Sequence, residues 1–124
     1  MKELIKLALN TSEKAYAPYS NFKVGAVCVT KNKNLYTGCN IENASYSLCC
    51  CAERTAIFNA VSKGEKDIEI IVVANKTKLP YPCGACLQVM AEFNLDMKVI
   101  VAKSEDEYKI FSLRELLPNS FKLN

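Results

Sequence analysis

The sequence feature that most constrains the fold is residues 68–74, a nearly continuous apolar run rich in β-branched side chains. Such a run is typical of a strand that is buried on both faces of a sheet. Residues 52–61, rich in helix formers, come before it and end at Lys63-Gly64, a plausible helix stop. Residues 84–93 predict another helix, after the rigid loop Pro80-Tyr81-Pro82. The pattern predicts a central strand covered by helices.

Flanking segments extend this pattern in both directions. Apolar residues spaced by three or four from Leu4 to Tyr16 predict an amphipathic first helix, which Pro18 ends. The other expected elements are strands at 24–30, 35–38 (antiparallel to the one before), 98–102 and 108–111, a loop at 39–50, and a last helix at 112–117 capped by Ser112. The resulting order, αββαβαββα, favours an α/β fold with a mixed sheet and helices on both faces.

Length and composition indicate a single domain spanning residues 1–124. A chain of 124 residues buries roughly two-thirds of its surface on folding, enough for one core. No apolar run approaches the length of a membrane span, and the N-terminus has no signal-peptide pattern, so we expect a cytoplasmic protein without membrane contact. All but two of the 16 basic residues are lysines spread along the chain, which argues against a nucleic-acid partner.

The chain contains no histidine and seven cysteines. The absence of histidine excludes a Ser-His-Asp triad, a Cys-His dyad and His-ligated zinc. An odd number of cysteines in a chain without an export signal argues against a disulfide framework. Metal or thiol chemistry is the better interpretation.

Three cysteines have the spacing of a metal site. Cys83 and Cys86 form a C-x-x-C at the start of a predicted helix, and Cys51 stands at the start of the helix before it. By itself the C-x-x-C also fits a redox motif or two buried thiols. Helix N-termini stabilise thiolates, so two helix starts can present three of them to one ion, for which zinc is the best match.

Two charged residues follow Cys51. Glu53 lies in the first helical turn, where its carboxylate can reach a water in an open fourth zinc position, the arrangement of a catalytic rather than a structural site. Alternatively, Glu53 is a solvated acid that the helix dipole favours. Arg54 can hydrogen-bond a ligating sulfur and offset the net charge of −1 that three thiolates and Zn²⁺ would carry, or it is an exposed helix residue.

These residues resemble the zinc deaminase signature in its three-cysteine form, and more closely the small, homotetrameric cytidine deaminases. The matching segments are Ala15-Tyr16-Ala17-Pro18-Tyr19-Ser20, Phe22-x-Val24-Gly25-Ala26, Gly38-Cys39-Asn40-Ile41-Glu42-Asn43-Ala44, Cys51-Ala52-Glu53-Arg54-Thr55-Ala56, Pro82-Cys83-Gly84-Ala85-Cys86 and Glu115-Leu116-Leu117-Pro118. The resemblance covers nearly the whole chain. It implies a three-layer α/β/α sandwich with a mixed five-stranded sheet.

The resemblance also implies a role for each matching site residue. Cys51, Cys83 and Cys86 would hold one zinc ion per subunit, Glu53 would be the proton shuttle, and Arg54 would neutralise the thiolates. The residues expected to bind substrate are Phe22 (packing on the base), Asn40 and Glu42 (the ribose), the backbone of Ala52 (the pyrimidine), and Tyr46 and Phe121 (reaching a neighbouring subunit's site). On residue type alone, Asn40 and Glu42 also fit ordinary loop solvation or an Asx turn, and Phe22 and Phe121 fit core or terminal packing.

The implied function is hydrolytic deamination of cytidine, and also of deoxycytidine, to the uridine nucleoside and ammonia by zinc-activated water. Such an enzyme is a hydrolase of a cyclic amidine C–N bond, serves pyrimidine salvage, and forms a homotetramer with shared active sites. A related alternative is deamination of a modified nucleoside such as blasticidin S. An alternative from another class is a structural zinc module with four ligands, Cys49, Cys51, Cys83 and Cys86.

Two positions depart from the family pattern. Cys50 completes a Cys49-Cys50-Cys51 run, so Cys49 or Cys50 is a candidate fourth ligand. Leu87 stands where the family usually has arginine, which removes a positive charge near the predicted metal helix.

Overall fold

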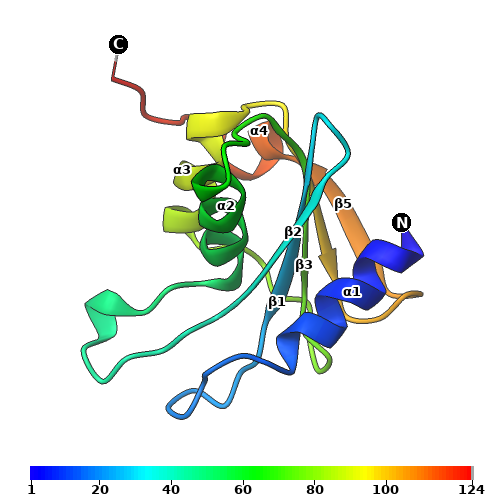
Figure 1. Cartoon of the computed structure of the whole chain (residues 1–124), viewed down its shortest axis with the longest axis vertical. Helices are drawn as coiled ribbons and strands as arrows, with labels where there is room; N and C mark the ends of the chain where they lie inside the picture. The colour runs from blue at the N-terminus through cyan, green and yellow to red at the C-terminus, as the bar shows by residue number, and fades with distance from the viewer. Residues whose placement is uncertain (124) are drawn as a thin grey trace.

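The computed structural model describes residues 1–123 and gives the order of elements that the sequence predicts (Figure 1). The elements are α1 (Lys2–Ser12), β1 (Gly25–Thr30), β2 (Leu35–Cys39), a 3-10 turn (Tyr46–Leu48), α2 (Ala52–Ser62), β3 (Ile68–Ala74), α3 (Gly84–Phe93), β4 (Lys98–Ala102), β5 (Tyr108–Ser112) and α4 (Leu113–Leu116). The last residue of the expected 1–124 domain, Asn124, lies outside the described residues. No helix between residues 1 and 123 combines the length and the apolar character needed to cross a membrane.

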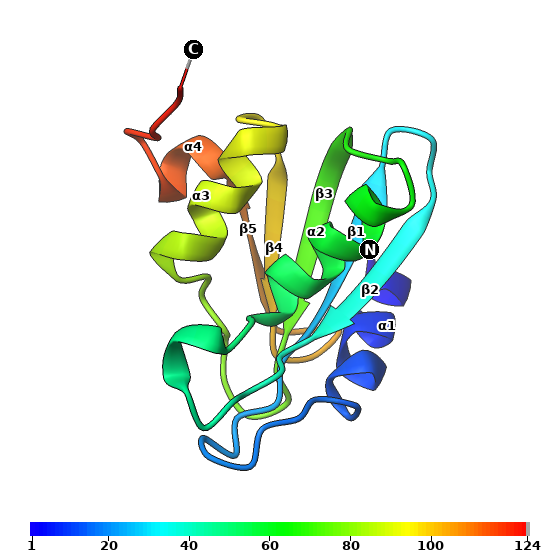
Figure 2. The ribbon, with the colours of Figure 1, turned by 60° about the vertical axis from the view of Figure 1, so that its left-hand side comes forward.

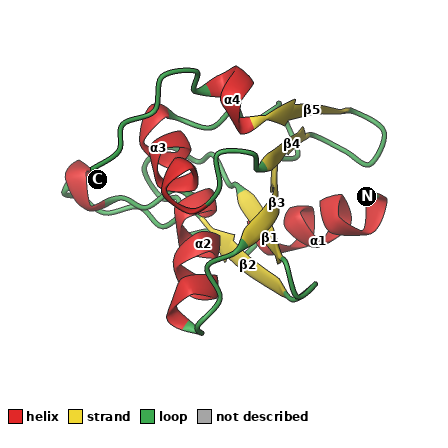
Figure 3. Ribbon diagram, turned by 90° about the horizontal axis from the view of Figure 1, so that it is seen from above, coloured by secondary structure: helices red, strands yellow, loops and turns green. Residues whose placement is uncertain are grey.

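The strands form one mixed sheet of five, in the order β2-β1-β3-β4-β5. Strands β3 and β4 pair in parallel, whereas β1 pairs antiparallel with β2 and β3, and β5 pairs antiparallel with β4. Seen from above, α2 and α3 lie on one face of the sheet and α1 lies on the other (Figure 3). The expected three-layer α/β/α sandwich with a mixed five-stranded sheet is therefore confirmed.

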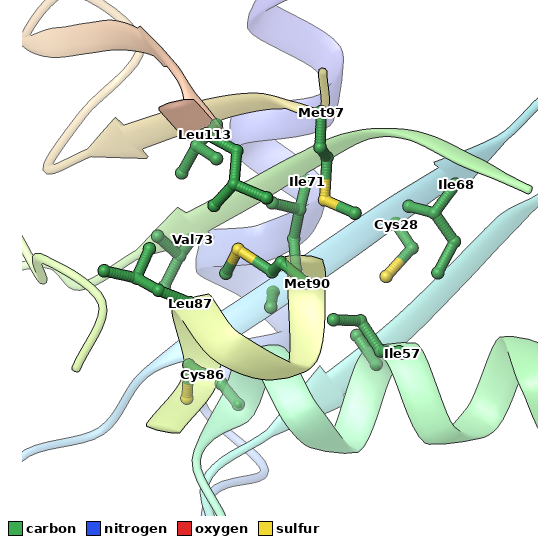
Figure 4. Close-up of a cluster of buried hydrophobic side chains, with 14 of the residues drawn as sticks. Cys28, Ile57, Ile68, Ile71, Val73, Cys86, Leu87, Met90, Met97 and Leu113 are labelled. Atoms are coloured by element: carbon green, nitrogen blue, oxygen red, sulfur yellow. The ribbon is translucent and has the colours of Figure 1, made fainter. Parts of the chain in front are cut away.

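The position of β3 between two helical layers explains why polar and apolar residues do not alternate in its sequence. Ile71 and Val73 belong to the cluster under α2 and α3, whereas Val72 and Ala74 belong to the cluster under α1. Because successive side chains of a strand point to opposite faces, a strand covered by helices on both faces needs apolar residues at successive positions, as at 70–74. Leu87 and Met90 of α3 lie beside Ile71 and Val73 in the larger cluster (Figure 4).

Close contact between α2 and β2 fixes the start of α2 relative to the sheet. A Cβ atom added at Gly38 would lie 2.3 Å from the backbone nitrogen of Ala56, much closer than real Cβ contacts come. The absence of a side chain at Gly38 thus allows the helix backbone to rest on the strand. This packing places the N-terminus of α2 near the end of β2, where the loop with Asn40 and Glu42 begins.

The prediction for the first helix was wrong at its C-terminal end. The helix ends at Ser12, and Tyr16 instead forms an isolated bridge with Ile41. Tyr16 donates its backbone N–H to the Asn40 carbonyl at 3.0 Å and accepts the Glu42 N–H at 2.8 Å. Apolar spacing continues past the helix, but these backbone groups pair with the loop that follows β2, so the segment is extended there.

Candidate metal centre and active site

Three cysteine sulfurs meet at the N-termini of α2 and α3, which lie on the same face of the sheet (Figure 2). Cys51 directly precedes α2, Cys83 directly precedes α3, and Cys86 lies in the first turn of α3. The Sγ atoms of Cys51 and Cys83 are 4.0 Å apart, those of Cys83 and Cys86 are 3.6 Å apart, and all three lie within 4.8 Å of one another. The cysteine grouping predicted from spacing is present.

These sulfur separations suit zinc. Tetrahedral zinc with Zn–S bonds of ~2.3 Å requires its sulfur ligands to be roughly 3.8 Å apart. The two observed separations bracket that value. Within residues 1–123 the cluster holds three soft sulfur donors and no fourth metal-binding side chain, which matches a site that keeps one coordination position open.

Of the three cysteines, Cys51 is the one whose thiolate form the surrounding groups favour. A hydrogen bond with Cys86 and another from Arg54 lower the pKa of the Cys51 thiol to about 5, against the opposing effect of burial. The Arg54 guanidinium donates to Cys51 Sγ at 3.3 Å, and this bond raises the pKa of Arg54. The hydrogen bond to Cys51, with burial, raises the pKa of Cys86. Arg54 is therefore not an exposed helix residue; of the two interpretations that the sequence left open, the contact with a cluster sulfur is the one observed.

Glu53 is buried beside the sulfurs. Its side chain is only 4% exposed, although it lies in the first turn of a helix where a solvated acid was the alternative interpretation. Burial raises the pKa of Glu53 to about 7, against the lowering effect of a backbone hydrogen bond. A buried carboxyl group beside the sulfurs is placed where a general acid or base is needed.

A cavity of about 220 Å³ opens over Glu53. Its lining residues are Ser20, Phe22, Val24, Asn40, Glu42, Cys51, Ala52, Glu53, Pro80, Tyr81 and Cys83. The structure thus brings together at one cavity most of the site residues expected from sequence, whereas Cys86 is buried and does not line the cavity. Ser20, Val24, Pro80 and Tyr81 were not predicted as cavity residues, and the only sequence signal for the last two was the rigid loop 80–82.

Asn40 and Glu42 are held by hydrogen bonds to the segment before β1. The Asn40 side chain donates to the Phe22 carbonyl at 2.8 Å and accepts the Val24 N–H at 2.9 Å. Glu42 accepts the N–H groups of Tyr19 and Ser20, and the Ser20 hydroxyl also donates to it. Both side chains are therefore fixed at the cavity wall, and neither is a loosely solvated loop residue.

The two expected partner-reaching aromatics lie outside the 220 Å³ cavity. Tyr46 is 74% exposed and lines a neighbouring hollow of about 410 Å³ that shares Ser20, Asn40, Glu42 and Cys51 with the cavity. Phe121 is 65% exposed, and its main chain exchanges two hydrogen bonds with the Gln88 side chain. Neither aromatic ring is packed in the core of its own chain.

The extra cysteines do not join the metal cluster. Cys49 Sγ accepts the Asn43 N–H at 3.2 Å, and Cys50 Sγ accepts the Thr55 hydroxyl at 3.5 Å. Among residues 1–123, the candidate metal-holding group contains Cys51, Cys83 and Cys86 only. This arrangement does not favour the four-cysteine structural module.

Leu87 occupies the core. It is 8% exposed and lies near Val73 (Figure 4), whereas an arginine was expected here from the family pattern. With leucine at this position, the three sulfurs still lie within 4.8 Å of one another.

Comparison with known proteins agrees with this geometry. Residues 1–103 match the family described as the cytidine and deoxycytidylate deaminase zinc-binding region. A cytidine deaminase of Halalkalibacterium halodurans is 48% identical over 120 residues, covering 95% of this chain and 91% of that protein.

Solved structures give the same result. The cytidine deaminase of Burkholderia pseudomallei superposes with a TM-score of 0.91 at 46% identity, covering 96% of this chain and 97% of the other. The cytidine deaminase of Mycobacterium tuberculosis superposes with a TM-score of 0.86 at 31% identity, covering 98% of this chain and 96% of the other. Together with the three-sulfur cluster and the buried carboxylate, these matches show that the chain belongs to the zinc-binding cytidine and deoxycytidylate deaminase family.

Proposed function

We propose that this protein catalyses the hydrolytic deamination of cytidine, and also of deoxycytidine, to the uridine nucleoside and ammonia. The observation that carries the proposal is the buried carboxylate of Glu53, which lines the same cavity as two cysteines of a zinc-compatible cluster. The relatives named cytidine deaminases support the same reaction. No feature of the cavity favours a modified nucleoside over cytidine.

In the proposed mechanism, Cys51, Cys83 and Cys86 would hold zinc. When bound, zinc lowers the pKa of water from 15.7 toward ~7 and so supplies the nucleophile at neutral pH. Glu53 receives one proton of the water and delivers it to the ring N3. The water oxygen bonds to C4, and the bond between C4 and the exocyclic amino nitrogen breaks. Glu53 carries the second proton to the departing amine. Both protons of the water are thereby accounted for, one on N3 of uridine and one on ammonia.

The other cavity residues are proposed to bind the nucleoside. Phe22 packs against the base, the Ala52 backbone positions the pyrimidine, and Asn40 and Glu42 hydrogen-bond the sugar hydroxyls. Lys78 supports Phe22 with its ammonium group 5.0 Å from the ring centroid, a cation–π distance.

We also propose a homotetramer with active sites shared between subunits, acting in pyrimidine salvage in the cytoplasm. Support for sharing comes from Tyr46 and Phe121, whose exposed rings match the aromatic positions that reach a neighbouring site in this family. Residues 1–124 would form one catalytic domain in each subunit, with neither nucleic acid nor membrane as a partner.

The test is to incubate the purified protein with cytidine and to follow the ultraviolet change that accompanies conversion to uridine, with and without a zinc chelator. We expect stoichiometric uridine and ammonia, loss of turnover after chelation, and recovery with added zinc. Blasticidin S in competition provides the specificity control. A zinc-loaded protein that leaves cytidine unchanged, or that turns over only blasticidin S, would contradict the proposal.

A further inference from the structure

The hydroxyl group of Ser20 connects two walls of the cavity. Ser20 Oγ donates a hydrogen bond to Oε2 of Glu42 and accepts one from the backbone N–H of Phe22 at 3.0 Å. Ser20 lies 22 positions before Glu42 in the sequence, so this contact exists only in the folded chain. One hydroxyl therefore contacts both the proposed sugar-binding carboxylate and the backbone of the proposed base-packing residue.

The Glu42 carboxylate is nearly saturated by these local donors. Its Oε1 atom accepts the backbone N–H of Tyr19 at 2.9 Å and that of Ser20 at 3.1 Å, while Oε2 accepts the Ser20 hydroxyl. A carboxylate has about four acceptor positions, two on each oxygen. Three are occupied, and the remaining one is on Oε2, the oxygen whose orientation the Ser20 hydroxyl sets.

The backbone between these donors has a constrained shape. Asn21 adopts a positive φ of 58° and donates its N–H to the Ala17 carbonyl at 3.0 Å, which turns the chain between Ser20 and Phe22. On the other side of Phe22, the Asn40 amide binds the Phe22 carbonyl at 2.8 Å. Phe22 is thus held at its N–H by Ser20 and at its carbonyl by Asn40.

We propose that Ser20 is a positioning residue for sugar recognition: its hydroxyl orients Glu42 so that a single acceptor position faces the substrate. This inference rests on the proposed function, because it concerns how the same cavity selects a nucleoside. A carboxylate with one free acceptor position selects for a hydroxyl at one place on the sugar. Without the Ser20 hydroxyl, Oε2 gains a second free acceptor position, and only the two backbone N–H bonds to Oε1 still hold the carboxylate, so the selection weakens.

The experiment compares cytidine with 2′,3′-dideoxycytidine, which lacks both ring hydroxyls, as substrates of wild type, Ser20→Ala and Ser20→Thr. We expect Ser20→Ala to lower kcat/KM for cytidine by about tenfold, mostly through KM, the loss typical of one hydrogen bond to a charged group. Its preference for cytidine over the dideoxy analogue should fall at least several-fold. Ser20→Thr keeps the hydroxyl and should keep the preference within about twofold of wild type. Ser62→Ala, a serine at the far end of α2, is the matched control.

A double-substitution cycle separates positioning from a general structural effect. In a Glu42→Gln background, adding Ser20→Ala should change kcat/KM for cytidine by less than about twofold, because the group through which Ser20 acts is already altered. If Ser20→Ala folds poorly, Ser20→Val can be compared with Ser20→Thr instead. These two side chains have nearly equal volume and differ in the hydroxyl group. An unchanged cytidine preference in the hydroxyl-free variant, or additive effects in the cycle, would overturn the inference. A wild type that deaminates neither nucleoside would instead refute the proposed function.

Discussion

The two ends of the candidate active site differ in how completely one chain builds them. At the zinc end, three sulfurs lie within 4.8 Å of one another, Arg54 contacts Cys51, and Glu53 is 4% exposed. At the rim, Tyr46 and Phe121 are 74% and 65% exposed. The groups that would perform the chemistry are fixed within the chain, whereas the aromatic groups that would enclose the substrate face outward.

This difference indicates that the chemistry and the enclosure of substrate depend on different parts of the structure. The zinc end is supported by the packing of α2 and α3 on the sheet, so changes there should affect metal and turnover within each subunit. The rim has little packing within its own chain, so changes there should act through neighbouring copies. The following predictions test this separation.

The largest effect is expected from removing one sulfur. Cys83→Ser should lose zinc and with it essentially all turnover of cytidine, because the bound metal supplies the activated water. Cys49→Ser is the matched control and should retain both properties, because Cys49 hydrogen-bonds Asn43 outside the cluster. Zinc content by atomic absorption and turnover of cytidine are the measurements. Equal zinc loss in the two variants would instead indicate that Cys49 is also a zinc ligand.

Glu53→Gln should separate chemistry from metal binding. The variant should keep one zinc per subunit but lose turnover by about 10²–10⁴-fold, the range for a positioned acid–base group. Glu92→Gln, an exposed acid on α3, should behave as wild type. Near wild-type turnover by zinc-loaded Glu53→Gln would show that another group shuttles the proton.

A smaller loss of activity is expected from a change at the rim, and mixing two different variants should partly restore the activity. Phe121→Ala should lower kcat/KM by about tenfold, as expected when one buried substrate contact is lost, without loss of zinc. When it is mixed with Glu53→Gln under conditions of subunit exchange, activity should rise above that of either variant alone. If active sites are shared as proposed, the mixed assembly would contain sites with an intact Glu53 next to an intact Phe121 from the partner. Activity that stays at the sum of the two separate variants would argue against shared sites.

The smallest effect on activity is expected at Glu65, beyond the C-terminal end of α2. Hydrogen bonds from Tyr36, Thr30 and Asn34 lower the pKa of Glu65 to about 2. Because the folded state holds this carboxyl ionised below its ordinary pKa near 4.5, Glu65 stabilises the fold above that pH. The stabilisation is lost as the pH falls from about 4.5 toward 2.

Glu65→Gln should therefore unfold at lower urea concentration than wild type near neutral pH, and the difference should shrink toward pH 2. Its kcat should match that of wild type. Urea denaturation across pH provides the measurement, and a difference between the two proteins that is constant with pH would contradict this assignment.

The sequence was most informative where burial forces a pattern. Residues 68–74 and 84–93 were predicted with the bounds that β3 and α3 have, because an apolar run marks the strand and a rigid proline loop precedes the helix. The three-cysteine cluster followed from two helix starts. The first helix was overextended because its apolar spacing continues into Tyr16, which pairs with the distant Ile41.

Contacts between distant segments were the part that could not be predicted. Nothing near Ser20 in the sequence indicates that its hydroxyl contacts Glu42, and nothing near Glu53 distinguishes a buried from a solvated acid. Both depend on how the segment before β1 packs against the loop after β2 and against the two helix starts. Long-range packing, rather than local propensity, determines these features.

The most direct test of the account is X-ray absorption spectroscopy at the zinc edge of the purified wild-type protein. The account predicts three sulfur neighbours at ~2.3 Å and one light atom, oxygen, at about 2.0 Å, since a catalytic site keeps one position for water. Four sulfur neighbours would mean that a further cysteine closes the site, and would contradict the central claim.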